Sequence, residues 1–204
     1  APALPPSAAL QQAAALMRAA RRPVLYGGGG LINAGPGACA AFTQLARRLH
    51  LPTTLTLMGL GAFPASDPRF LGMLGMHGTL EANQAMHHAD LIVCVGARFD
   101  DRVTSKLTDF APRAKKIHID IDAKNINKVV AVDVALHGDC AQVLDALLAA
   151  LPTQAPPTHP QDHRLDAWWQ RIQTWRSHNS LGFTPRADVI LPQQLMHSLQ
   201  QQLT

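Results

Sequence analysis

The sequence predicts an α/β fold: a doubly wound, mostly parallel sheet of five to six strands with helices on both faces. Three observations favour this class. Apolar runs of strand length alternate with amphipathic runs of helix length. The run Leu91–Val95 is apolar throughout, as in a strand covered on both faces, and glycines follow both this strand and the first predicted one. With 204 residues, 47% of them apolar and 16% charged, the chain can bury a sizeable core.

Periodicity and the positions of Pro and Gly predict the order of the elements. A helix begins near Ser7, which can cap it, and continues to about Arg22; the strand 23–26 then leads into the glycines 27–30. The region 58–75 is rich in Gly and Pro and predicts a long loop. The remaining strands are expected over 52–56, 90–95, 116–121 and 129–135, and the remaining helices over 36–49, 79–88 and 140–151, the last capped by Asp139.

Three parts are expected along the chain: an α/β domain over 1–151, a linker and surface helix over 152–185, and the start of a further domain over 186–204. The segment 152–160 is rich in Pro, which is typical of a linker. Three tryptophans and Ile172 recur at helical spacing within 162–178, which predicts an amphipathic helix lying on a neighbouring surface. The run 188–191 and a helix over 192–202 resemble the first elements of a domain that does not follow. We therefore expect the chain to be a piece of a longer polypeptide.

Composition narrows the class of partner. The 18 Lys and Arg against 14 Asp and Glu give a net charge of +4, but the basic residues are scattered, which favours small anionic ligands over nucleic acid. Cys39, Cys94 and Cys140 show no CxxC spacing, which is typical of reduced cysteines in a cytoplasmic protein. The sequence shows neither a signal peptide nor an apolar run of about 18 residues, so no membrane partner is expected.

The stretch that follows Leu91–Val95 is the strongest candidate site. The strand ends at Gly96, and Arg98 and Arg102 follow with Asp100 and Asp101 between them. In open parallel sheets, ligands bind beyond the carboxyl ends of the strands, and arginine forks match phosphate oxygens. The alternative is a surface turn in which these arginines and aspartates pair in water.

The glycines after the first strand do not fit the dinucleotide fingerprint GxGxxG. The template placed on Gly28 meets Asn33 at its last position, and placed on Gly27 it meets Ile32. What remains is a glycine cluster at a helix start, where exposed backbone amides favour an anion. The alternative is a tight turn without a ligand.

Two further groups of polar residues are candidates. The alternating run 117–122 places His118, Asp120 and Asp122 on one face, where the carboxylates can accept hydrogen bonds from a ribose or an adenine amino group. A metal site with His118 and a simple cap of the turn 123–125 are the alternatives. His77 and Glu81 stand one helical turn apart, so Glu81 can orient the imidazole, although packing is the commoner role of such a histidine.

Together these stretches resemble the central domain of the large, catalytic subunit of acetohydroxyacid synthase (acetolactate synthase), a thiamine-diphosphate enzyme family. The resemblance covers about Ala14–Leu151 densely and continues through the tryptophan helix. The motifs that carry it are Leu74–Gly78 with Glu81–Asn83, Gly96–Thr104, and Ile119–Asp122 with Asn125–Lys128. Other thiamine enzymes with the same three-domain plan share the fold but do not carry this set.

The resemblance implies that the domain binds FAD in an extended pose, and it assigns residues to each part of the cofactor. Gly28, Gly29, Gly30, Arg98 and Arg102 are assigned to the pyrophosphate or ribityl chain, Thr56, Leu57, Leu74, Met76 and His77 to the flavin end, and Asp120, Ile121, Asp139 and Cys140 to the adenosine end. Gly96, Asp100, Val103 and Asn125 complete the cofactor-binding set. No catalytic and no metal-binding residue is expected in this chain.

The resemblance also implies the reaction and the partners. The family condenses pyruvate with a second 2-ketoacid on thiamine diphosphate and Mg²⁺ for branched-chain amino-acid biosynthesis, and its flavin is not consumed. Its catalytic subunits form homodimers and bind a regulatory small subunit. The glutamate that activates thiamine belongs to the preceding domain and the GDG…N motif to the following one, so the chain alone is expected to bind FAD weakly or not at all and to be inactive. The alternatives are a stand-alone module for NAD, ADP or coenzyme A, and a structural domain with an empty cleft.

Overall fold

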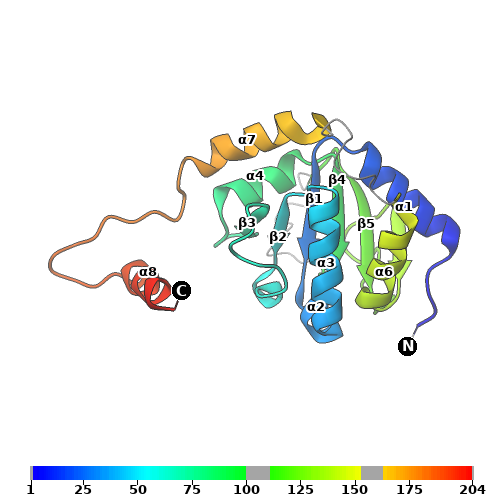
Figure 1. The fold of residues 1–204 in the computed structure, drawn as a ribbon, viewed down its shortest axis with the longest axis horizontal. Coiled ribbons are helices and arrows are strands. Elements are labelled where there is room, and N and C mark those ends of the chain that lie inside the picture. Colours follow the sequence, from blue (N-terminus) through cyan, green and yellow to red (C-terminus); the bar gives the residue numbers. More distant parts are fainter. Residues whose placement is uncertain (1, 100–110, 153–162, 204) are drawn as a thin grey trace.

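The computed structural model describes residues 2–99, 111–152 and 163–203 (Figure 1). The strands are β1 (Pro23–Gly27), β2 (Thr53–Leu55), β3 (Phe70–Met73), β4 (Leu91–Val95), β5 (Lys115–Asp120) and β6 (Val134–His137). The helices are α1 (Ser7–Ala19), α2 (Gly29–Ala34), α3 (Pro36–Arg48), α4 (Leu80–His88), α6 (Cys140–Ala150), α7 (Asp166–Arg176) and α8 (Pro192–Gln202), with 3-10 turns at Leu57–Gly59 and His163–Leu165.

The six strands form one parallel sheet in the order β3-β2-β1-β4-β5-β6. β1 and β4 pair along their whole length, with Pro23 opposite Leu91 and Gly27 opposite Val95. The direction in which the chain adds strands reverses between β1 and β4. In sheets of this kind a ligand binds at that switch point, outside the carboxyl ends of the strands. The predicted doubly wound parallel sheet is confirmed, and its order indicates where a ligand site belongs.

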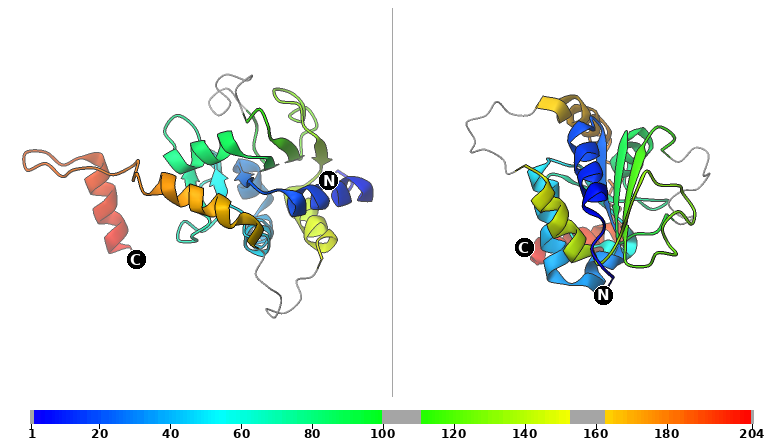
Figure 2. Two further views of the ribbon diagram at one scale, coloured as in Figure 1. Left: turned by 90° about the horizontal axis from the view of Figure 1, so that it is seen from above. Right: turned by 90° about the vertical axis from the view of Figure 1, so that its right-hand side faces the viewer.

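Helices cover both faces of the sheet (Figure 2). Helices α1, α3 and α6 pack on one face, where Leu25 and Val93 belong to a first buried core. Helix α4 packs on the other face, where Tyr26 and Ile92 belong to a second core. Consecutive residues of a strand point to opposite faces of the sheet, so a strand that is covered on both faces needs apolar residues at successive positions. This double coverage explains why β4 is apolar throughout.

One of the two predicted helix caps is confirmed and the other is wrong. Asp139 Oδ1 accepts hydrogen bonds from the amides of Ala141 at 3.0 Å and Gln142 at 3.2 Å, as an N-cap does. Ser7 is instead the first residue inside α1, and Pro6 stands at the N-cap without a side-chain hydrogen bond. The Pro6 carbonyl accepts hydrogen bonds from the amides of Ala9 at 3.0 Å and Leu10 at 3.2 Å. Pro6 therefore occupies the N-cap position that was expected for Ser7, and the helix begins one residue earlier.

Three elements differ from the sequence-based expectation. The region 58–75 is not a continuous loop, because it contains the edge strand β3, whose pairing with β2 shifts register. The strand expected over 129–135 exists but is displaced toward the carboxyl end, since β6 covers Val134–His137 and residues 129–133 are irregular. The glycine cluster also opens the short helix α2, which the sequence does not indicate. All three are short or glycine-containing, so their periodicity is weak and their conformation depends on neighbouring elements.

Helix α7 confirms the expected tryptophan-bearing surface helix, although it covers Asp166–Arg176 rather than 162–178. It crosses the amino-terminal edge of the sheet and packs on α4 (Figure 1). Trp168 and Ile172 are buried in the second core, and Trp168 Nε1 donates to the Pro23 carbonyl at 3.0 Å. The expected linker 152–160 lies outside the described residues except for Pro152. Helix α8 stands away from the body with none of its residues buried, and residues 188–191 form neither helix nor strand.

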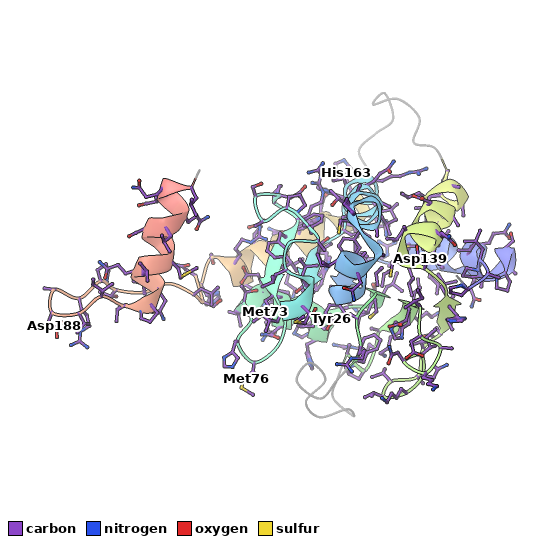
Figure 3. All side chains as sticks on the ribbon, turned by 90° about the horizontal axis from the view of Figure 1, so that it is seen from below. Tyr26, Met73, Met76, Asp139, His163 and Asp188 are labelled. Atoms are coloured by element: carbon purple, nitrogen blue, oxygen red, sulfur yellow. The ribbon has the colours of Figure 1, made fainter. Side chains whose placement is uncertain are left out.

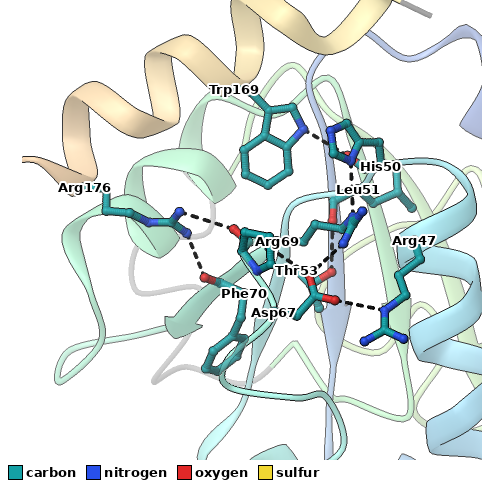
Figure 4. Close-up of polar contacts among 10 residues, drawn as sticks. Arg47, His50, Leu51, Thr53, Asp67, Arg69, Phe70, Trp169 and Arg176 are labelled. Carbon is teal, nitrogen blue, oxygen red and sulfur yellow. Dashed lines mark hydrogen bonds and ion pairs between the residues drawn. The ribbon is translucent and has the colours of Figure 1, made fainter. Parts of the chain in front are cut away.

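A polar network fastens the amino-terminal edge beneath α7 (Figure 4). The buried carboxylate of Asp67 accepts hydrogen bonds from Arg47 Nε at 2.9 Å and Arg69 Nη1 at 2.8 Å. Arg69 Nε donates to His50 Nδ1 at 3.2 Å, and the His50 carbonyl accepts from Trp169 Nε1 at 3.0 Å. The network therefore links the end of α3, the segment before β3 and α7.

Candidate functional site

A groove of about 460 Å³ follows the carboxyl-terminal edge of the sheet, at the opposite edge from α7. Segments that directly follow β1, β2, β4, β5 and β6 supply its walls. Its lining residues are Gly29, Gly30, Asn33, Ala34, Thr56, Met58, Gly96, Ala97, Arg98, Asp120, Ile121, Asp122, Asn125, Asp139 and Cys140. The groove therefore spans the switch point between β1 and β4, where this class of sheet binds ligands.

Glycines form the floor of the groove because two backbone segments touch there. A Cβ on Gly28 would lie 2.4 Å from the Gly96 oxygen, and a Cβ on Gly30 would lie 2.6 Å from the Gly96 Cα. The Gly28 amide donates to the Val95 carbonyl at 3.0 Å and the Gly30 amide to the Gly96 carbonyl at 2.9 Å. The expectation that these two amides are exposed to an anion is therefore wrong, since both are used to join the loops.

Arg98 is the cation of the groove among the described residues, and together with Gly29 and Gly30 it forms what we call the basic part. Its side chain is exposed, whereas Ala97 and Phe99 on either side are buried and anchor the segment. A guanidinium held this way can offer two parallel donors to a phosphate. The predicted neighbours Asp100, Arg102 and Val103 lie outside the described residues.

The other end of the groove, the acidic part, contains Asp120, Asp122 and Asp139. Asp120 is only 5% exposed, and its Oδ1 accepts from the Asp122 amide at 2.8 Å and from Asn125 Nδ2 at 3.3 Å. Asp122 Oδ1 accepts from the Lys124 amide at 2.9 Å. The carboxylates thus cap the turn after β5, as one of the alternatives expects, and they also face the groove.

His118 lies beneath the groove and is missing from the predicted site set. Its side chain is fully buried, its Nε2 lies 2.9 Å from the Ala97 carbonyl oxygen, and it lies 3.7 Å from Asp120 Oδ2. Burial lowers the pKa of His118 below its usual value, against the opposing effects of the Ala97 and Asp120 oxygens. The imidazole is therefore neutral at pH 7. The signal in the sequence is a histidine between Ile117 and Ile119, in a strand that the fold covers on both faces.

Cys140 lines the groove at the start of α6 and is a weak acid there. Burial, followed by the Asp139 and Asp120 carboxylates, raises the pKa of its thiol to about 12. The thiol is therefore protonated at pH 7. It behaves as an apolar wall of the groove rather than as a nucleophile.

Ten of the predicted site residues meet in the groove, whereas five do not. Gly28 contacts Gly96 and Ala97 but does not line the groove, and Leu74 is buried in the second core. Leu57, Met76 and His77 are exposed, and Figure 3 shows Met76 pointing away from the body. The expected His77–Glu81 pairing is not the one that forms, because Glu81 pairs with Arg176 Nε at 3.7 Å. Four further residues line the groove without having been expected at the site: Asn33, Ala34, Met58 and Ala97.

Two other classes of site are absent from the part of the chain that the structure describes. It contains no group of three or more His, Cys, Asp or Glu side chains placed to hold a metal ion. None of its helices combines the length and the apolar character needed to cross a membrane. A second groove, of about 980 Å³, is lined mainly by α3 and the end of α6 rather than by segments that follow strands. The groove at the switch point is therefore the candidate functional site.

Comparison with known proteins identifies the class to which this fold and groove belong. Residues 10–147 match the family model of the thiamine pyrophosphate enzyme central domain, so the chain belongs to that family. The resemblance to acetolactate synthase large subunits is also confirmed. The chain is 46% identical over 180 residues to the acetolactate synthase large subunit of Haemophilus influenzae, which covers 88% of the chain and 30% of that protein.

Other relatives agree. The chain is 45% identical over 179 residues to the isozyme 3 large subunit of Escherichia coli, covering 88% of the chain and 30% of the relative. It is 44% identical over 198 residues to the large subunit of Parasynechococcus marenigrum, covering 96% of the chain and 30% of the relative. The chain therefore spans about 30% of the length of these relatives.

Proposed function

We propose that this chain is the FAD-binding central domain of an acetolactate synthase large subunit. The observation that carries the proposal is the groove at the switch point of the sheet, combined with the similarity to large subunits of that enzyme. The complete enzyme would condense pyruvate with pyruvate or 2-ketobutyrate on thiamine diphosphate. Three buried or half-buried cysteines without disulfides suit a cytoplasmic location for it.

The residues of the groove suit FAD in one orientation, with its pyrophosphate at the basic part and its adenosine at the acidic part. The basic part suits the negatively charged pyrophosphate, and the acidic part supplies acceptors for the ribose hydroxyls and the adenine amino group. Thr56 and the exposed Met58 extend the groove beyond Gly29, on the side left for the flavin. A Cβ on Gly29 would lie 3.2 Å from Met58 Cβ, so a larger residue at position 29 would narrow the groove. In the proposed role the flavin supports the structure, because the condensation leaves it unchanged.

Most of the chemistry is expected outside this chain. The sequence contains no GDG…N motif for magnesium and diphosphate, and the resemblance places the activating glutamate in another domain. We therefore expect other domains of the subunit, a second large subunit and a regulatory small subunit as partners. The purified 204-residue chain, supplied with pyruvate, thiamine diphosphate, Mg²⁺ and FAD, should form no acetolactate. Turnover by the chain alone would contradict this part of the proposal.

The proposal requires the chain alone to bind FAD at least weakly, so a titration that detects weak binding tests the FAD site. The ¹⁵N-labelled chain is titrated with FAD to millimolar concentration while its amide signals are followed. The proposal expects shifts at the groove amides, among them Gly29, Arg98, Asp120 and Cys140, and none in α8. If millimolar FAD shifts none of the groove amide signals, the FAD assignment is overturned.

The second candidate is a stand-alone module for NAD, ADP or coenzyme A. The observation that favours it is the strand order 3-2-1-4-5-6, which this sheet shares with dinucleotide-binding sheets. The same titration with NAD and coenzyme A separates the two candidates. Tighter binding of either compound than of FAD would favour the stand-alone module.

A further inference from the structure

His118 joins the two parts of the groove from below. It lies on β5, between β4 and the edge strand β6, and pairs with Cys94 of β4. Its Nε2 lies 2.9 Å from the Ala97 carbonyl oxygen, in the segment that carries Arg98, and the same atom lies 3.7 Å from Asp120 Oδ2 in the acidic part. Phe99 packs against it edge-on, with ring centroids 5.2 Å apart. Burial of a polar ring destabilises the fold unless the ring forms hydrogen bonds. The hydrogen bond between Nε2 and the Ala97 carbonyl therefore accounts for a histidine at this buried position.

That bond sets the protonation state of the ring. The partner of Nε2 is the Ala97 carbonyl oxygen at 2.9 Å, which can only accept. Nε2 must therefore carry the hydrogen. Nδ1 has no hydrogen-bond partner among the described residues, and a proton there would put a buried charge on the ring. The neutral form with its hydrogen on Nε2 is the one that this environment supports.

The same carbonyl belongs to the peptide that leads into Arg98. It also accepts the thiol of Cys94, with Sγ 3.1 Å from the oxygen, so two buried donors hold one peptide plane. The neighbouring Gly96 amide donates to the Ile119 carbonyl at 2.9 Å, which ties the turn to β5 as well. The Gly28 and Gly30 amides hold the turn after β4 from one side, at Val95 and Gly96, and β5 holds it from the other. Of the contacts to the Ala97–Arg98 peptide itself, the one from β5 is the His118 hydrogen bond.

We propose that His118, as the neutral Nε2–H tautomer, is a positioning residue that orients the Ala97–Arg98 peptide and thereby holds Arg98 at the basic part of the groove. The role of Arg98 toward a pyrophosphate rests on the proposed function, whereas the orientation of the peptide does not. His118 itself lies beneath the floor and contacts no ligand, since its side chain is fully buried.

Three variants test the proposal. His118→Phe retains a planar ring but removes the donor, whereas His118→Gln retains an N–H donor at nearly the same reach. Ile172→Ala serves as the control, because it opens the second core from α7 at the opposite edge of the sheet. The probe is ADP, which carries the pyrophosphate and adenosine parts of FAD, and its affinity is measured by calorimetry beside the ¹⁵N spectra of the ligand-free chain.

The expected results separate positioning from general stability. In the ligand-free wild-type chain, the imidazole ¹⁵N shifts should show a protonated Nε2 and a bare Nδ1. His118→Phe should displace the Arg98 amide signal and weaken ADP binding about tenfold, the effect of one lost hydrogen bond of average strength. His118→Gln should restore affinity to within about threefold, and Ile172→Ala should leave the ADP affinity unchanged despite its lower melting temperature.

Other outcomes overturn the proposal. A hydrogen on Nδ1, an Arg98 amide unmoved by His118→Phe, or equal losses for the Phe and Gln variants would each exclude the positioning role. If the wild-type chain binds neither ADP nor FAD, the proposed function fails instead. The tautomer and the Arg98 amide then still decide the role of His118, because neither measurement requires a ligand.

Discussion

At the scale of single residues, the groove depends on two loops that approach each other backbone to backbone. Gly96 has φ +57°, and a Cβ on it would lie 2.8 Å from the Gly30 Cα. Both the strain and the contact disfavour a side chain. We expect Gly96→Ala to lower the free energy of unfolding by about 2 kcal/mol, measured by urea titration.

Gly37 is the matched control for this prediction. It lies in α3, and a Cβ there would meet no atom within 4 Å. Gly37→Ala should therefore raise stability by about 0.5 kcal/mol, because alanine loses less conformational entropy in a helix. Equal effects of the two substitutions would mean that the contact between the loops is not tight.

Arg98 gives a second prediction at this scale. Its exposed guanidinium is the cation that lines the groove among the described residues. Arg98→Ala should weaken ADP binding about tenfold or more, because a charge-assisted hydrogen bond is lost. Arg18→Ala, which removes an exposed cation from the last turn of α1, should leave the affinity unchanged. Calorimetry that finds the same loss for both would indicate a general effect of charge.

At the scale of elements, the polar network around Asp67 holds the amino-terminal edge together. Burial alone would raise the pKa of Asp67, but hydrogen bonds from the Arg69 amide and from the Arg47 and Arg69 side chains outweigh it, so that pKa is lowered. A lowered pKa in the folded state contributes stability that is present above the unfolded-state pKa and is lost as pH falls through the folded-state value.

The Asp67→Asn variant should therefore show a pH-dependent difference. Above about pH 5 wild type should be the more stable protein by a constant margin, and that margin should shrink progressively below about pH 4. Urea unfolding of both proteins from pH 3 to pH 7 measures it. A margin that does not change with pH would show that the carboxylate is not charged within the network.

Helix α7 supplies a further prediction at this scale. Trp168→Phe removes the hydrogen bond to the Pro23 carbonyl and leaves part of the second core unfilled. The free energy of unfolding should fall by about 1–3 kcal/mol. Gln173→Ala, on the exposed side of the same helix, should change it by less than about 0.5 kcal/mol. If the Trp168 variant is as stable as the Gln173 variant, α7 is not docked as described.

The elements also show how far the sequence determines the fold. β1, β4 and β5 were predictable because each is a buried strand with an unbroken or cleanly alternating apolar pattern. β3 was not, since it is an edge strand that contains Gly72 and is only partly buried. α2 was not either, because six residues that begin with two glycines form a helix only when the contact between Gly30 and Gly96 holds them.

At the scale of the whole molecule, most of the groove was predictable for a topological reason. Arg98 follows β4, Asp120 ends β5 and Cys140 follows β6, and parallel strands bring all their carboxyl ends to one edge. Met58 and Asn33 were not predictable, because their positions depend on the 3-10 turn after β2 and on α2. Sequence order locates residues that end strands, whereas residues between elements need the tertiary structure.

The central claim is that the carboxyl-terminal edge between β1 and β6 receives the nucleotide half of FAD. A crystal structure of the chain grown with saturating FAD tests it most directly. The account predicts the pyrophosphate beside Gly29, Gly30 and Arg98, with the adenosine directed toward Asp120 and Cys140. FAD bound at another surface, or a groove without FAD at a concentration that saturates the chain in solution, would contradict it.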